Sequence, residues 1–103
     1  MTRNIRVAAK VIRSKNSGPF ELTLDIIFKD RGYYELFKKK HIITAAAIAR
    51  LYGVPERDVL KVVYFEPSYA IKVTLKRRIP SGAPGDTDIY GAQQHAPLLG
   101  ITF

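Results

Sequence analysis

The sequence predicts an α+β fold, a two-layer sandwich in which a four-stranded, mostly antiparallel sheet packs against two helices. Two observations support this class. Apolar residues alternate with polar ones in two early and two later segments, and two capped helical patterns lie between them. Strands grouped on both sides of a helical centre favour one sheet under one helical layer. With 103 residues, the chain is expected to be a single domain, 1–103.

The first two strands are expected at residues 5–13 and 20–28, because apolar residues occupy every second position in both. Residues 14–19 are polar and end in Gly-Pro, which is typical of a turn. The two strands are therefore predicted to form a hairpin with a wide loop.

Two helices should follow. Asp30 is a good N-cap for a helix that runs to about Lys40, where three lysines favour the helix C-terminus. Thr44 is expected to cap a second helix over residues 45–52, and Gly53 is expected to end it.

The last two strands are predicted at residues 60–65 and 69–76, joined by a tight turn that contains Pro67. From Pro80 onward the alternation stops, and residues 80–86 are expected to form a loop. The remainder is predicted to be a long irregular C-terminal tail with an apolar end.

The chain is basic, with a net charge of +8 and no cysteine. Residues 1–40 carry ten basic and four acidic side chains, residues 41–78 carry seven and three, and residues 79–103 carry two aspartates only. A basic protein attracts nucleic acid, membranes or anionic substrates. The absence of cysteine excludes thiolate chemistry, and no apolar stretch is long enough to span a bilayer. A cytoplasmic protein without membrane partners is expected.

The first candidate site is the polar turn after the first strand. Its candidate ligand-binding residues are Arg13, Ser14, Lys15, Asn16 and Gly18. Two cations, two hydrogen-bonding side chains and a glycine amide could cradle a small anion such as a carboxylate or phosphate. The alternative is an ordinary turn whose side chains cap their own backbone.

The second candidate site is the irregular stretch at residues 81–95. His95 and Asp86 are the candidate catalytic residues, because this pair permits acid–base chemistry. The further candidate ligand-binding residues are Ser81, Gly82, Gly85, Asp88, Tyr90, Gln93 and Gln94. A lone histidine beside two carboxylates is a sparse ligand set, so no metal and no cofactor are expected. Alternatively, His95 is a hydrogen-bonded structural residue and Asp86 an ordinary turn residue.

Nucleic-acid binding is less favoured than these readings. Residues 38–40 and 76–78 are short basic runs at the ends of predicted elements, where a solvated or subunit-facing surface explains them. The aromatic pattern of an RNA-recognition strand is missing.

Residues 14–28, 48–59 and 79–99 together resemble a small family of about this length that is known mainly as a domain of unknown function. This family is similar to the ferredoxin-fold module associated with acyclic terpene utilisation (AtuA) type proteins. The resemblance implies a ferredoxin-like layout and a larger catalytic partner of the AtuA type. Arg13 and Ser14 match the start of that module's turn, whereas residues 15–18 depart from it.

Three functions from different classes remain open. The leading one is a small accessory subunit or domain of a metabolic enzyme that handles organic-acid or acyl-CoA type substrates, with both polar loops at a shared interface. In that reading the apolar tail docks on the partner; its residues are Leu98, Leu99, Ile101 and Phe103. The alternatives are a free-standing homo-oligomeric lyase or isomerase with a site between copies, and a nucleic-acid-binding module.

Overall fold

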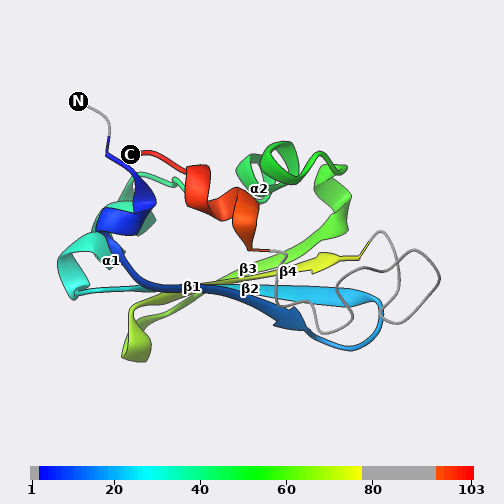
Figure 1. Cartoon of the computed structure of the whole chain (residues 1–103), viewed down its shortest axis with the longest axis horizontal. Helices are drawn as coiled ribbons and strands as arrows, with labels where there is room; N and C mark the ends of the chain where they lie inside the picture. The colour runs from blue at the N-terminus through cyan, green and yellow to red at the C-terminus, as the bar shows by residue number, and fades with distance from the viewer. Residues whose placement is uncertain (1–2, 78–94) are drawn as a thin grey trace.

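The computed structural model describes residues 3–77 and 95–103, and it confirms the α+β sandwich. Four antiparallel strands form one sheet in the order β1-β2-β4-β3, and both helices lie on the same side of it (Figure 1). The elements are β1 (Ala9–Asn16), β2 (Glu21–Phe28), α1 (Arg31–Lys39), α2 (Ala45–Tyr52), β3 (Val59–Phe65) and β4 (Ala70–Lys76).

The chain builds the sheet from two hairpins, β1-β2 and β3-β4, with the helices between them. This order differs from the β-α-β-β-α-β order of a ferredoxin-like motif, so the likeness extends to the two layers and not to the connectivity. The inner strands β2 and β4 are the most buried, whereas β1 and β3 form the edges. In the first hairpin the more apolar strand, β2, takes the centre, whereas in the second hairpin β3 is the more apolar strand and yet lies at the edge.

The first strand begins later than its alternation suggests. Ile5–Val7 is a 3-10 helix (η1), because Asn4 accepts a hydrogen bond from the Arg6 amide and so caps a turn. The strand itself is Ala9–Asn16. The prediction of a strand at 5–13 followed by a loop at 14–19 was therefore wrong by several residues, and the turn is confined to 17–20.

Both helix caps form as predicted. Asp30 accepts a hydrogen bond from the Tyr33 amide at 3.0 Å, and Thr44 accepts one from the Ala47 amide at 3.1 Å. Gly53 ends α2 with φ of 65°, a left-handed conformation that glycine adopts at little cost.

The end of the chain belongs to the core. Ala96–Gly100 forms a 3-10 helix (η4), in which Leu98 is fully buried. The Phe103 ring lies 4.8 Å from the Phe37 ring, and Arg3 and Phe103 exchange two backbone hydrogen bonds. Leu98 is therefore not free to dock on a partner, whereas docking through the half-buried Leu99, Ile101 and Phe103 stays a prediction. In Figure 1, η4 lies between η1 and α2 on the helical side of the sheet. The loop predicted at residues 80–86 lies outside the described residues.

Candidate binding face on the open side of the sheet

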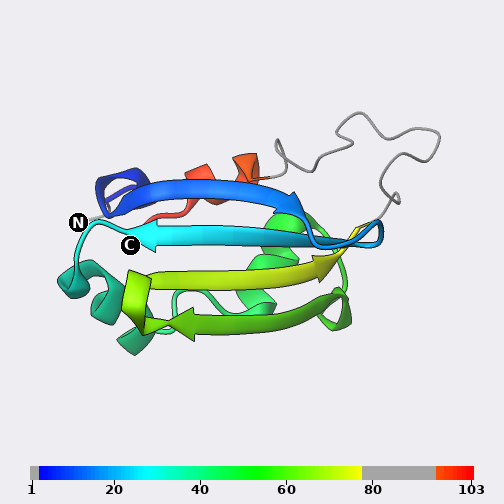
Figure 2. The same ribbon diagram turned by 90° about the horizontal axis from the view of Figure 1, so that it is seen from below.

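One face of the sheet carries no helix. In Figure 2 the four strands are seen from this side, with α1, α2 and the two terminal 3-10 helices behind or beyond them. In β2, the core takes Leu22, Leu24, Ile26 and Phe28. Because side chains alternate along a strand, the intervening residues of β2 lie on the uncovered side, which we call the open face.

The strand register orders the open face into three rows, each of which crosses all four strands. The apolar row is Val11, Ile27, Ala70 and Phe65; the middle row is Arg13, Asp25, Lys72 and Val63; the lysine row is Lys15, Thr23, Thr74 and Lys61. The face therefore changes from apolar at one end to basic and hydroxylated at the other.

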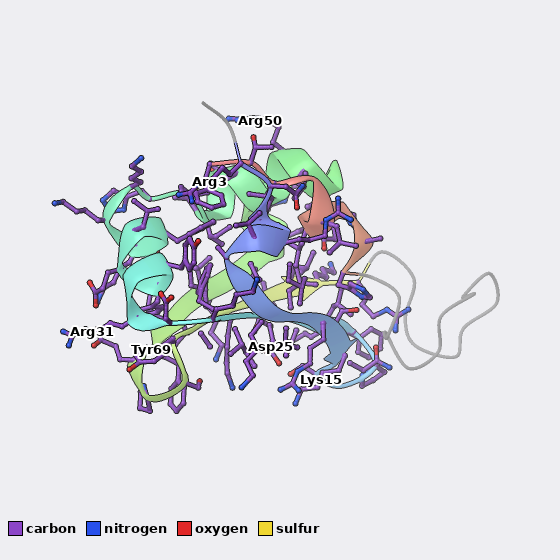
Figure 3. All side chains as sticks on the ribbon, turned by 60° about the vertical axis from the view of Figure 1, so that its left-hand side comes forward. Arg3, Lys15, Asp25, Arg31, Arg50 and Tyr69 are labelled. Carbon is purple, nitrogen blue, oxygen red and sulfur yellow. The ribbon has the colours of Figure 1, made fainter. Side chains whose placement is uncertain are left out.

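A shallow depression of about 420 Å³ lies over the basic end. It is lined by Lys15, Ser17, Glu21, Thr23, Asp25, Lys61, Val63, Lys72 and Thr74. These residues come from all four strands and the β1-β2 turn, so the sheet itself fixes their relative positions. Figure 3 shows Asp25 and Lys15 on the side of the sheet opposite Arg3 and Arg50.

Asp25 is the most unusual residue of the open face. Its side chain is only 2% exposed, and its Oδ2 lies 3.1 Å from Nε of Arg13, whose side chain is 56% exposed. The other oxygen, Oδ1, is buried and has no hydrogen-bond partner among the described residues. A buried carboxylate with one unpaired oxygen costs free energy and does not stabilise a fold. The stability of the fold therefore does not explain why a carboxylate lies at this position.

The lysines around Asp25 are not neutralised. Among the described residues, Lys15, Lys61 and Lys72 form no ion pair. Lys72 lies over Phe65, with Nζ 5.4 Å from the ring centroid. Three lysines and two acidic residues, Glu21 and Asp25, line the depression. Arg13, the partner of Asp25, brings the total to four basic and two acidic side chains, a net charge of +2. The depression therefore favours an anion.

The part of the apolar surface that lies on β3 is exposed, whereas Ala70 is buried and Val11 and Ile27 are half-buried. Val63 is 41% exposed and Phe65 is 44% exposed, and both lie on the edge strand β3. Adjacent Tyr69, where η3 (Glu66–Ser68) ends, is also exposed and has φ of 52°. Exposed aromatic and aliphatic groups next to basic ones are common in protein interfaces.

A second polar cluster lies at the α1 end of the sheet and has a structural role. Lys38 and Glu66 form an ion pair of 2.7 Å that joins α1 to η3. Their hydrogen bond raises the pKa of Lys38 and lowers the pKa of Glu66. Burial raises the pKa of Tyr34, whose ring lies 5.9 Å from Nζ of Lys38. Burial also raises the pKa of Tyr52. Tyrosines shifted this way stay protonated, so they cannot act as bases near neutral pH.

Residues 5–102 match a protein family described as Domain of unknown function (DUF4387). The chain belongs to this family. This confirms the expectation of a small uncharacterised family and covers every helix and strand described above. No curated protein and no solved structure matches the chain.

The first predicted site is divided between two sides of the sheet. Arg13 and Lys15 lie on the open face, whereas Ser14 and Asn16 face the helical layer. They do not form one cradle, because residues 13–16 are strand and not loop. Asn16 accepts a hydrogen bond from Arg77, and Gly18 lies in the turn with φ of 94°.

The second predicted site is described only at its last residue. His95 is half-buried and directly precedes η4, where its carbonyl accepts a hydrogen bond from the Leu98 amide at 2.9 Å. The other residues of this site lie outside the described ranges: Ser81, Gly82, Gly85, Asp86, Asp88, Tyr90, Gln93 and Gln94. The acid–base pairing of His95 with Asp86 stays a prediction.

Sequence reasoning missed most of the open face. Of the residues that line the depression it selected only Lys15 and missed Ser17, Glu21, Thr23, Asp25, Lys61, Val63, Lys72 and Thr74. One local signal was available, because Asp25 is a charged residue in the middle of the apolar and hydroxylated run from Leu22 to Phe28. The grouping of the others depends on strand register, which the sequence does not display.

The described residues offer neither a metal-binding cluster nor a membrane-spanning helix. Within residues 3–77 and 95–103, no three histidine or acidic side chains gather in a way that could hold a metal ion. No helix in those ranges is both long enough and apolar enough to cross a bilayer.

Proposed function

We propose that this chain is a small accessory subunit or domain of a metabolic enzyme that handles organic-acid or acyl-CoA type substrates. In this proposal, its open face docks on a larger catalytic partner. The observation that carries the proposal is the uncovered sheet face, on which exposed apolar groups adjoin a buried carboxylate with an unpaired oxygen.

The composition of the face supports docking over simple solvation. An antiparallel sheet with one solvated face normally shows polar residues there. Here the apolar row and Val63 place five apolar residues among the twelve positions of the three rows. Ala70 is already buried, but covering the exposed Val63 and Phe65 and the half-buried Val11 and Ile27 would remove apolar surface from water, at about 25 cal/mol per Å².

Charge selects the kind of partner. The face carries a net positive charge around the depression, so a second copy of the chain would bring two basic surfaces together. A different protein with carboxylates on its surface would instead be attracted. Residues 14–28, 48–59 and 79–99 resemble the family, and the similarity of that family to modules beside AtuA-type proteins supports an enzyme of that type as the partner.

The test is affinity purification of the tagged chain from its source cell under mild conditions, followed by mass spectrometry. The wild-type chain should retain a larger protein in a fixed ratio, and that complex should turn over an organic-acid or acyl-CoA substrate. Val63→Asp and Phe65→Asp should each abolish the association, because they place a charge in the apolar part of the interface.

Leu51→Asp is the matched control. Leu51 is 38% exposed on α2, on the opposite side of the sheet, so this variant should retain the partner. Equal losses in all three variants, with folding intact by circular dichroism, would contradict docking through the open face. A homo-oligomer without any second protein would instead support the free-standing enzyme.

A further inference from the structure

The lysine row has a nearly symmetric arrangement of groups. Lys15 and Lys61 lie on the two edge strands, and Thr23 and Thr74 lie between them on the two central strands. Three strand spacings separate the Cα atoms of the two lysines, a distance of about 14 Å. Long flexible stems allow both ammonium groups to lean inward over the threonines.

Both threonine hydroxyls are available to a ligand. Thr74 is buried and Thr23 is half-buried, yet no hydrogen bond to either hydroxyl occurs among the described residues. A hydroxyl donates one hydrogen bond, and a carboxylate accepts several. Each threonine can therefore donate a hydrogen bond to a carboxylate that lies at the centre of the row.

The acidic groups around the row do not cancel its charge. Glu21 and Asp25 are the two carboxylates in the lining, and Arg13 pairs with Asp25. The net charge of +2 matches a dianion. The unpaired Oδ1 of Asp25 is buried and can only accept hydrogen bonds, so the lysines and threonines of the row, and not this oxygen, would hold the anion.

We propose that this depression binds a small dicarboxylate anion. One carboxylate lies at Lys15 and Thr23, and the other lies at Lys61 and Thr74. This inference deepens the proposed function by naming a substrate class. It rests on the proposed function only for the claim that the dicarboxylate is a substrate of the partner enzyme. Binding itself requires the isolated chain alone, since every group named above belongs to it.

The experiment is a titration of the ¹⁵N-labelled full chain with succinate at low ionic strength, followed by NMR. The amide signals of Lys15, Thr23, Lys61 and Thr74 should shift together along one saturable curve. Lys15→Ala and Lys61→Ala should each weaken binding about tenfold or more, since hydrogen bonds to charged groups have this magnitude. Lys39→Ala, which removes an exposed lysine from α1, should leave the affinity unchanged.

Two further probes define the ligand class. Acetate should bind at least about tenfold more weakly than succinate, because it engages only one of the two lysines. Inorganic phosphate should also bind more weakly, since it cannot span the row. Phosphate that binds more tightly than succinate would overturn the dicarboxylate assignment.

The proposal fails if succinate up to about 10 mM shifts none of these signals, or if Lys39→Ala weakens binding as much as Lys61→Ala does. Neither result contradicts the docking proposal, provided that the tagged chain retains a larger protein in the purification experiment. Conversely, if the chain binds succinate but captures no partner, the docking proposal is contradicted and the dicarboxylate proposal stands.

Discussion

Leu98→Ala will destabilise the protein strongly, by about 2–5 kcal/mol, as expected when a buried leucine leaves a cavity. Leu98 is fully buried in η4 and belongs to the same core cluster as the inward residues of β2 and β4. For a domain of this size, the loss corresponds to a fall in the unfolding temperature of roughly 10 °C or more. Thermal and chemical unfolding measure it directly.

The control makes the same chemical change at an exposed position. Leu51→Ala removes the same atoms from the surface of α2 and should alter the free energy of unfolding by no more than about 0.5 kcal/mol. Similar small losses in both variants would show that the last nine residues are not part of the core. The packing of Phe103 on Phe37 would then have to be revised as well.

Substitution of the two partners of the Arg13–Asp25 ion pair should change stability in opposite directions. Arg13→Met leaves the Asp25 carboxylate buried without its partner and should destabilise the protein by about 1–3 kcal/mol. Asp25→Val removes that carboxylate, while Arg13 remains largely exposed and hydrated. This variant should therefore be neutral or more stable than the wild type, by up to about 2 kcal/mol.

Denaturant unfolding of both variants tests this difference in sign. Lys10→Met, which removes another exposed cation of β1, controls for the general loss of charge and should change stability by less than about 0.5 kcal/mol. If Asp25→Val destabilises the protein as much as Arg13→Met does, Asp25 is a structural residue and its unpaired oxygen gives no support to a binding role.

The parts of the fold that local chemistry specifies were predictable from the sequence. Asp30 and Thr44 cap their helices through their own side chains, and Gly53 supplies the left-handed residue that ends α2. The start of β1 was not predictable, because Ile5 alternates like a strand residue but lies in a turn held by Asn4. That turn depends on pairing with residues 101–103, a contact between the two ends of the chain.

The candidate site was less predictable than the fold. Arg13 and Lys15 were selected for their charge, but their neighbours Ser14 and Asn16 were assigned to the same site and lie on the other side of the sheet. A one-residue step along a strand reverses the direction of the side chain. Thr74 and Lys61 come within reach of Lys15 only after β4 takes its place between β2 and β3, which is a property of the assembled sheet.

The central claim is that the open face meets a partner, and lysine footprinting tests it most directly. The purified native assembly and the isolated chain are each treated with an amine-reactive acetylating reagent, and modified lysines are quantified by mass spectrometry. Lys15, Lys61 and Lys72 should be protected in the assembly, while Lys39 and Lys40 of the α1 end should react equally in both samples. Equal reactivity of the three open-face lysines in the two samples would contradict the account.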